Sequence, residues 1–367
     1  MSPRPLRALL ITAATGWRGS SASFAKIARG LLDRGHGVRL VAGGAPLAER
    51  FRALGLDASE LRLKNTGLRE VRALRAIVRA QGTTAVLADT PRDLRVSLLA
   101  GWFRLPVVYR YNLNYRRPRT DLGDRIFLAG AAGFAYQSAF IEGEAVRHQP
   151  FLARRRHWRV PNGYDLDGEL APRPGAGAAL RARLDLPADV PIVLTGSALA
   201  ENKGHDVVFA ALARLAGEGL RFVYVLPGQG KREAELRALA QRLAVPTHFL
   251  GFVEPAAMPE VMAAADIVAH PATTEIFPNV VAEAMALERA VVAADAGGIP
   301  EVVGDEGAGV LVPGTDVAAW SGALRALLVD PARRAAMGQA ARRRLAREFP
   351  LARMQQGYAE LLTEISR

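Results

Sequence analysis

The segment Ile192-Val193-Leu194-Thr195-Gly196-Ser197 is a short apolar strand that runs into a turn of small residues. A helical pattern follows over 204–216, and a second apolar strand, Phe222-Val223-Tyr224-Val225-Leu226, comes directly after it. Continuously apolar strands are typical of a parallel sheet covered on both faces, and a helix between two strands supplies the crossover. This stretch therefore predicts a doubly wound α/β domain.

The same alternation extends through most of the chain. Further strands are expected at 9–11, 38–41, 85–88, 107–109, 249–250, 267–269 and 291–293, and further helices at 21–34, 67–81, 92–102 and 232–244. Two successive series predict two domains, because single cores stop growing at about 250–300 residues and this chain has 367. We expect the join near Val160-Pro161-Asn162-Gly163, where Pro and Asn-Gly interrupt the pattern.

The composition excludes several classes of protein. The chain has no cysteine, which excludes disulfides, thiolate metal sites and a cysteine nucleophile. Its six histidines show no HExxH-type spacing. No segment reaches the roughly 20 apolar residues that span a bilayer, and the apolar stretch 8–14 is interpreted as a buried strand rather than a signal peptide. A cytoplasmic protein is expected.

Charge is distributed unevenly along the chain. Residues 1–162 carry 28 basic and 11 acidic side chains, whereas 163–367 carry 20 and 25. Arginines gather in the helix at 67–81 (Arg69, Arg72, Arg75, Arg79), at 116–119 and at 154–159. Such an excess indicates an anionic partner, either a phosphorylated lipid-linked glycan or an anionic membrane surface. Arginines on the solvent side of an ordinary amphipathic helix are the alternative. Nucleic acid is not expected, because no recognised binding motif accompanies the arginines.

Two loops between a strand and a helix could approach phosphate. Thr15-Gly16-Trp17-Arg18-Gly19-Ser20-Ser21 lacks the GxGxxG pattern, and a plain glycine turn is an equal interpretation. In the second half, Lys203 stands at an expected helix start, where an ammonium group and the free helix amides suit a diphosphate. The alternative for Lys203 is a solvated position near the helix end.

A further helix start is expected at Pro278-Asn279. Two glutamates eight positions apart lie on either side of this start, one in the preceding loop and one inside the helix. Glu275 precedes this helix, and the backbone amides of Asn279 and Val280 would be free to hold phosphate. Glu283 lies within an apolar run, which is an expensive place for a charge without a partner. Two solvated carboxylates are the alternative, and the apolar surroundings of Glu283 argue against it.

Several motifs occur in one order along the chain. They are the Gly/Ser loop at 15–21, Arg34-Gly35-His36, Val160-Pro161-Asn162-Gly163-Tyr164-Asp165, Lys203-Gly204-His205-Asp206, Pro227-Gly228-Gln229-Gly230, Phe249-Leu250-Gly251-Phe252-Val253, Glu275 with Glu283, and Gly297-Gly298-Ile299-Pro300-Glu301. The ordered set resembles the retaining nucleotide-sugar glycosyltransferases of family 4. That resemblance implies the GT-B fold, an α/β architecture of two facing Rossmann-like doubly wound domains with an inter-domain cleft.

The resemblance also assigns the parts of the chain. Residues 1–162 would bind the acceptor, 163–345 would bind the donor, and a C-terminal helix within 346–367 would pack back toward the N-terminal domain. Glu275 would bind hydroxyls of the donor sugar, Lys203 the diphosphate, and Glu283 the ribose. The remaining donor-binding candidates are Arg18, Gly19, Ser197, Gly228, Lys231, Phe252, Val253, Ile276, Phe277, Pro278, Asn279 and Val280.

The implied reaction moves a hexosyl-type sugar from a nucleoside diphosphate, UDP rather than GDP, to a carbohydrate or glycolipid acceptor with retention of configuration. Cell-envelope polysaccharide, lipopolysaccharide or glycolipid synthesis is the expected setting, on the inner face of the plasma membrane. No metal and no further cofactor is expected, because Lys203 and helix-end amides would stabilise the leaving diphosphate. A front-face displacement is favoured over a double displacement with a carboxylate nucleophile.

The chain departs from the family pattern at three places, one of which is the glycine and proline usual before Val291-Val292, replaced by Glu288 and Ala290. The arginine usual about five residues before the lysine is replaced by Ser197-Ala198, and the histidine usual near 110 is absent. Arg18 could supply the missing diphosphate contact, and Arg110, Tyr111 and Asn112 are the candidates on the acceptor side. A non-catalytic member that only binds nucleotide sugar is the alternative. A dinucleotide-dependent oxidoreductase is a weaker one, because GxGxxG and the ribose-binding acid are missing.

Overall fold

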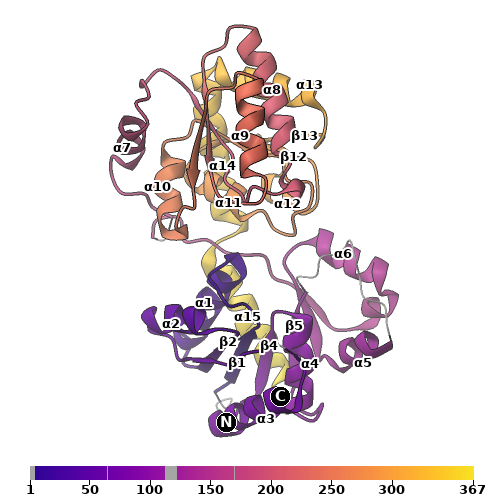
Figure 1. The fold of residues 1–367 in the computed structure, drawn as a ribbon. Coiled ribbons are helices and arrows are strands. Elements are labelled where there is room, and N and C mark those ends of the chain that lie inside the picture. The colour runs from indigo at the N-terminus through magenta and orange to yellow at the C-terminus, as the bar shows by residue number, and fades with distance from the viewer. Residues whose placement is uncertain (1–4, 64, 112–121, 169) are drawn as a thin grey trace. The chain divides into compact units, whose positions relative to one another are not determined.

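The computed structural model describes residues 5–63, 65–111, 122–168 and 170–367. These form two compact domains, Met1–Gly163 with Leu351–Arg367, and Tyr164–Pro350 (Figure 1). The chain enters the second domain one residue after the join placed from sequence, and it returns at Leu351 rather than at 346. Both chain ends therefore belong to the first domain, whose last helix is made by the C-terminal segment.

The first domain is built on a parallel seven-stranded sheet in the order β3-β2-β1-β4-β5-β6-β7. Its strands are β1 (Arg7–Thr12), β2 (Gly37–Ala42), β3 (Ala58–Glu60), β4 (Ala85–Ala88), β5 (Val107–Arg110), β6 (Gly133–Tyr136) and β7 (His157–Arg159). Its helices are α1 (Gly19–Leu32), α2 (Ala45–Ala53), α3 (Leu68–Gln81), α4 (Pro91–Ala100), α5 (Leu122–Gly130), α6 (Ala139–His148) and α15 (Leu351–Ile365), with a 3₁₀ turn at Pro150–Arg154.

The second domain has a parallel six-stranded sheet in the order β10-β9-β8-β11-β12-β13. Its strands are β8 (Ile192–Leu194), β9 (Val223–Pro227), β10 (Thr247–Gly251), β11 (Ile267–His270), β12 (Ala290–Ala294) and β13 (Val310–Val312). Its helices are α7 (Ala176–Arg183), α8 (His205–Gly217), α9 (Glu233–Arg242), α10 (Met258–Ala263), α11 (Asn279–Ala286), α12 (Ile299–Val303), α13 (Val317–Leu328) and α14 (Pro331–Glu348), with 3₁₀ turns η2 (Glu201–Lys203) and η3 (Pro255–Ala257).

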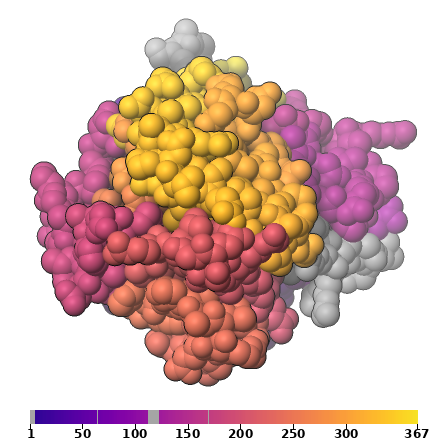
Figure 2. Space-filling model, turned by 90° about the horizontal axis from the view of Figure 1, so that it is seen from above, coloured from indigo at the N-terminus to yellow at the C-terminus, as the bar shows by residue number. Residues whose placement is uncertain are grey.

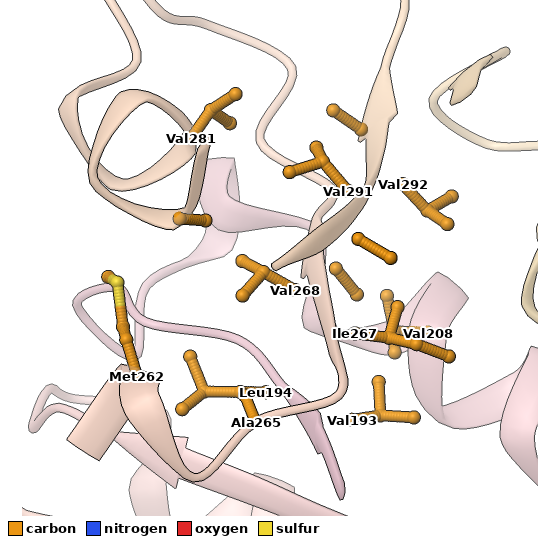
Figure 3. Packing of buried hydrophobic residues seen from close by; sticks show 14 of the residues in the cluster. Val193, Leu194, Val208, Met262, Ala265, Ile267, Val268, Val281, Val291 and Val292 are labelled. Atoms are coloured by element: carbon orange, nitrogen blue, oxygen red, sulfur yellow. The ribbon is translucent and has the colours of Figure 1, made fainter. Parts of the chain in front are cut away.

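The core of the second domain lies on both faces of its sheet. Figure 3 shows Leu194 and Val268 on the side of Met262 and Val281, and it shows Val193 and Ile267 on the side of Val208. Successive side chains of a strand point to opposite faces, so an apolar run fills both layers. Figure 2 looks onto this domain, where the golden surface of α13 and α14 adjoins the rose surface of α8. The doubly wound architecture predicted from sequence is confirmed.

Each sheet reverses its strand order at one place, between β1 and β4 in the first domain and between β8 and β11 in the second. At such a reversal the loops after the two neighbouring strands diverge to opposite faces, which leaves a crevice at the carboxyl ends of the strands. The loop that contains Lys203 follows β8, and the loop that contains Glu275 follows β11. The topology therefore brings these two loops to the same edge of the sheet.

One helix ends earlier than its sequence pattern predicts. The helix expected at 92–102 stops at Ala100, because Trp102 and Phe103 adopt left-handed backbone conformations with φ of 52° and 55°. Left-handed φ is incompatible with a continuing right-handed helix, and bulky side chains rarely adopt it. Gly101, which caps the helix, and Pro106 are ordinary signals of a helix end, and the expected range 92–102 extended past the first of them.

Candidate functional site

A charged pair marks the strand-order reversal of the second domain. The ammonium group of Lys203 donates a hydrogen bond to Glu275 Oε1 over 2.5 Å. The Lys203 side chain is 21% exposed and the Glu275 side chain 17%. Both charges are thus largely withdrawn from water yet still open on one side. The two residues that the sequence ranked as catalytic are brought together here.

Two glycines hold the backbone of this pair. Gly204 has φ of 67°, and a Cβ atom there would lie 2.3 Å from the carbonyl oxygen of Pro271. Gly297 has φ of 61°, and its Cβ would lie 2.3 Å from the carbonyl oxygen of Glu275. That same carbonyl accepts a hydrogen bond of 2.8 Å from the Gly298 amide. Close backbone approach of this kind is available only to glycine.

His270, at the end of β11, adds a third polar group to the pair. Its side chain is 3% exposed, and its Nε2 atom lies 3.6 Å from Glu275 Oε1, which is too long for an ordinary hydrogen bond. Burial alone would raise the pKa of Glu275, but the His270 ring and the Lys203 charge outweigh it and hold that pKa below its usual value. Glu275 is therefore a carboxylate at neutral pH. The sequence analysis missed His270, although a histidine that ends an apolar strand was a usable signal.

A second histidine supports the loop after β8. His205 is fully buried, and its Nε2 atom lies 3.1 Å from Ser197 Oγ. Burial, assisted by the charge of Arg232, lowers the pKa of His205 to about 4, so the ring is neutral at neutral pH. Gly228, with φ of 143°, approaches the same loop, since its Cβ would lie 2.0 Å from the Ser197 carbonyl oxygen. Ser197 and Gly228 thus lie together at this sheet edge.

Helix α11 begins at Asn279, the start that the sequence predicted. The structure shows the contacts of two of the predicted residues at this helix start. The Asn279 amide donates to the carbonyl of Phe277 over 3.0 Å, so it does not point toward a ligand. The Phe277 side chain is 6% exposed, and its ring packs with those of Tyr164 and Phe349 rather than lining a pocket. Tyr164 also donates its hydroxyl to Asn279 Oδ1 over 2.7 Å, which fixes the start of the helix.

The other candidates near α11 differ in exposure. Pro278 is buried, whereas Ile276, Val280 and Glu283 are half-buried. Glu283 lies one helical turn after Asn279 and Val280, on a helix whose other residues from 281 to 286 are buried. Its half-buried carboxylate is therefore the acidic group that α11 contributes to this region.

The remaining second-domain candidates lie on the loops after β9 and β10. Lys231 is exposed, Phe252 is 59% exposed, and Val253 is half-buried against the core. The Gly228 amide donates to the Gly251 carbonyl over 2.8 Å, which joins these two loops. Phe252 therefore presents an exposed aromatic ring beside the Gly228 loop.

The candidates of the first domain fall into two groups. Arg18 and Gly19 are exposed at the start of α1, where no side chain caps the helix and no acidic residue lies in the first turn. Arg110 and Tyr111 are 1% and 3% exposed, so the structure does not offer their side chains to an acceptor. Asn112 lies outside the described residues. The acceptor-side role of these residues stays a prediction.

Arg110 instead belongs to a buried polar network. Its guanidinium donates to Asp89 over 3.3 Å and to Asn162 Oδ1 over 3.2 Å. The same Asn162 oxygen accepts from the Gln137 amide over 2.8 Å and from the Ser23 hydroxyl over 3.0 Å. The network ties β4, β5 and β6 to the last residues of the first domain, and its role is structural.

The described part of the chain lacks two features. Within 5–63, 65–111, 122–168 and 170–367, no group of three or more histidine, aspartate or glutamate side chains converges as metal ligands would. In the same part of the chain, no helix is both long and apolar enough to cross a bilayer.

Comparison with protein families identifies the second domain. Residues 178–344 match the family model described as Glycosyl transferases group 1. This segment is a group 1 glycosyltransferase domain. It contains the Lys203–Glu275 pair, His270, Gly228 and helix α11, which means that every feature of the charged site lies inside the matched region.

Curated relatives match half or more of the chain. The D-inositol 3-phosphate glycosyltransferase of Xylanimonas cellulosilytica is 42% identical over 190 residues, which is 50% of this chain and 45% of that protein. The GDP-mannose-dependent alpha-(1-6)-phosphatidylinositol monomannoside mannosyltransferase of Mycolicibacterium smegmatis is 34% identical over 251 residues, or 66% and 62%. The chain thus spans about half to three-fifths of the curated relatives it matches.

Solved structures extend the likeness of fold beyond the glycosyltransferase domain. The structure of Anabaena HepE in complex with UDP and glucose superposes with a TM-score of 0.84 at 21% identity, and the match covers 98% of this chain and 100% of that one. At this identity the likeness concerns the fold alone. The two parallel-sheet domains have the GT-B fold, and this prediction from sequence is confirmed.

Proposed function

We propose that the protein is a retaining glycosyltransferase that moves a hexosyl group from a nucleoside diphosphate sugar to a carbohydrate or glycolipid acceptor. The observation that carries the proposal is the Lys203–Glu275 pair, which lies at the strand-order reversal of a group 1 glycosyltransferase domain. The Lys203 ammonium group could bind a diphosphate, and the Glu275 carboxylate could accept hydrogen bonds from sugar hydroxyl groups. No further cofactor is required by this chemistry.

In the proposed donor complex, Lys203 exchanges its partner. Its ammonium group moves from the Glu275 carboxylate to the diphosphate, and the released carboxylate accepts hydrogen bonds from sugar hydroxyls. His270 stays beside Glu275 and keeps it oriented and ionised. Glu283 accepts from the ribose hydroxyls, and the loops of Gly228, Lys231 and Phe252 border the nucleotide.

The proposed reaction needs no metal ion. The bond between the anomeric carbon and the diphosphate oxygen breaks, and the acceptor oxygen bonds to the same face of that carbon. The acceptor proton passes to the departing phosphate oxygen. Lys203 stabilises the negative charge that develops on the leaving group, which is the electrostatic contribution expected of a fixed cation in a site partly withdrawn from water.

The nucleotide and the acceptor are narrower proposals. We propose UDP as the nucleotide; the Anabaena structure contains UDP, whereas the Mycolicibacterium relative is named for GDP-mannose. The excess of basic residues in 1–162 supports an anionic acceptor such as a phosphorylated, lipid-linked glycan. Both curated relatives named above act on inositol phosphates or their lipids, by their names. Envelope glycan or glycolipid synthesis in the cytoplasm is the proposed setting.

A nucleotide-sugar-binding protein without transferase activity is the second candidate, because Ser197-Ala198 replaces the usual arginine and no histidine stands near 110. Thermal shift against a panel of UDP- and GDP-sugars first identifies the donor, since a ligand that binds only the folded state raises the melting temperature. Donor hydrolysis and transfer are then measured with and without EDTA, and NMR of the product's anomeric proton reports retention. Binding without turnover would favour the second candidate.

Site variants sharpen this test. Glu275→Gln and Lys203→Met should each lower the transfer rate by about 10²-fold or more, as loss of one stabilising group does elsewhere. Glu260→Gln is the matched control. Like Glu275, Glu260 is a carboxylate paired with a basic side chain, in this case Arg173, and it lies in the same domain outside the proposed site. Unchanged rates in both site variants would refute the assignment.

A further inference from the structure

Two consecutive aromatic residues project from the first domain at the end of α4. Trp102 is 68% exposed and Phe103 is 47% exposed, and both have left-handed backbone conformations. Each such conformation costs on the order of 1–3 kcal/mol for a residue that is not glycine. Contacts with Arg75 and Phe127 offset part of this cost, but more than half of Trp102 and almost half of Phe103 remain exposed.

Arginine surrounds this aromatic turn. The Arg75 guanidinium lies 4.2 Å from the centre of the Trp102 ring and donates to the carbonyls of Leu99 and Ala100 over 2.8 and 3.0 Å. Arg104 follows in the same turn and is exposed. Helix α3, which packs against α4, adds exposed arginines at 69, 72 and 79. Among the described residues, none of these four exposed arginines forms an ion pair.

Apolar surface continues onto the neighbouring helix. The rings of Phe103 and Phe127 stack with their centres 6.0 Å apart, and Phe127 belongs to α5, which packs against α4. Ile126, beside it in sequence, is 54% exposed. Figure 1 shows α3, α4 and α5 within the first domain. We call Trp102, Phe103, Ile126 and the arginines at 69, 72, 75, 79 and 104 the aromatic–arginine face.

We propose that the aromatic–arginine face docks on an anionic lipid bilayer, independently of the transferase activity. Tryptophan and phenylalanine favour the boundary between head groups and acyl chains, while arginine heads remain at the level of lipid phosphate. Each basic residue near such a surface adds attraction of order 1 kcal/mol. The face combines both requirements, and its charge is complementary to anionic lipid because none of the four exposed arginines is held in an ion pair within the part of the chain that the structure describes.

Flotation with vesicles tests this proposal on the full chain without donor or acceptor. We expect binding to vesicles of phosphatidylcholine mixed with phosphatidylglycerol, weaker binding at high salt, and little binding to phosphatidylcholine alone. Trp102→Gly and Phe103→Gly should each weaken binding about tenfold or more. Glycine relieves the left-handed strain at these positions, which offsets the loss of the ring contacts with Arg75 and Phe127, so both variants should remain folded.

Charge and control variants complete the experiment. Arg72→Gln and Arg79→Gln should each weaken binding about fivefold, which is the effect of one basic residue at the membrane surface. Val329→Ser and Arg183→Gln remove an exposed apolar and an exposed basic side chain of the second domain, and they should leave binding unchanged. Absence of vesicle binding, equal binding to neutral vesicles, or unchanged binding by Trp102→Gly would overturn the proposal. Because no sugar transfer is measured, failure here leaves the transferase proposal standing.

Discussion

The Lys203 ammonium group lies 2.5 Å from Glu275 Oε1 although 72 residues separate the two in sequence. Their loops follow β8 and β11, neighbouring strands that belong to opposite halves of the sheet order. In this structure each charge neutralises the other, and a bound diphosphate would compete with Glu275 for Lys203. The pair is thus both a structural contact and, in the proposed function, the place where donor binding begins.

The first prediction concerns the stability contributed by this pair. Lys203→Met or Glu275→Gln alone should lower the free energy of unfolding by about 1–3 kcal/mol, because the remaining charge is largely withdrawn from water. The double variant should lose less than the sum of the two, with a coupling of about 1–2 kcal/mol. Urea unfolding at neutral pH measures all three, and additive losses would contradict direct coupling.

Acid should remove the contribution of Glu275. Folding lowers the pKa of the Glu275 carboxyl group. Such a group stabilises the folded state at pH values above its pKa in the unfolded chain, about 4.3 for glutamate. That stabilisation is lost as the pH falls through the pKa of the folded chain. The difference in melting temperature between the parent chain and Glu275→Gln should therefore be largest near neutral pH and shrink below about pH 4. A difference that grew in acid would contradict the lowered pKa.

The second prediction concerns the backbone that positions Lys203. Gly204→Ala should destabilise the second domain by about 2 kcal/mol or more, because φ of 67° strains alanine and the new methyl group would meet the Pro271 carbonyl. Gly217→Ala is the control: Gly217 ends the same helix, and nothing lies within 4 Å of its Cβ position. Calorimetry should show a lower melting temperature for the first variant and an unchanged or higher one for the second.

Much of the fold could be predicted from local pattern. The apolar runs at 192–194, 267–269 and 291–293 became β8, β11 and β12 with bounds shifted by no more than one residue, because burial on both faces leaves a continuous apolar signature. Four strands were not predicted: β3, β6, β7 and β13. The edge strands β3 and β7 carry exposed or half-buried residues and no such signature, whereas the buried β6 and the apolar β13 were overlooked. The break after α4 coincides with Gly101, a signal that the helical periodicity of 92–102 outweighed in the prediction, whereas the left-handed turn at Trp102 and Phe103 has no sequence signal.

The sequence was enough to choose the central charged pair of the site, but it was not enough to predict which other candidate side chains are buried. Lys203 and Glu275 could be chosen because both occur in an ordered set of motifs, and the structure brings them together. The burial of Arg110 could not be foreseen, because its partners Asp89 and Asn162 come from segments that meet only in three dimensions. The same holds for Phe277, whose aromatic neighbours Tyr164 and Phe349 lie far away in sequence.

The third prediction concerns the buried network of the first domain. Arg110→Met leaves the Asp89 carboxylate, which is 5% exposed, without its cation, and it should cost about 3–5 kcal/mol in unfolding free energy. Arg110→Met combined with Asp89→Asn should recover part of this loss. Arg52→Met, at an exposed position on α2, should stay within about 0.5 kcal/mol of the parent chain. An Arg110→Met variant as stable as the Arg52 control would show that the network is dispensable.

The last prediction concerns Asp93, whose carboxyl group is fully buried at the start of α4. Burial raises the pKa of Asp93 to about 8, with a further rise from the Asp89 charge, although the hydrogen bond with Thr90 opposes the shift. In the unfolded chain the Asp93 carboxyl group has the ordinary aspartate pKa of about 3.9 and loses its proton above that pH. The folded chain keeps this proton up to about pH 8. Because the unfolded state binds fewer protons over this interval, stability should fall as the pH rises from about 4 to about 8.

Asp93→Asn separates this charge effect from the hydrogen bonds. An asparagine oxygen can still accept from the amides of Thr90 and Ala13, now 2.8 and 3.2 Å from Asp93 Oδ2, but it cannot ionise. The melting temperature of the variant should vary less between pH 5 and 8 than that of the parent chain, and it should exceed the parent value at about pH 8 and above. Asp33→Asn, at an exposed position, should reproduce the parent profile. Parallel profiles for Asp93→Asn and the parent chain would mean that Asp93 is already ionised in the folded protein.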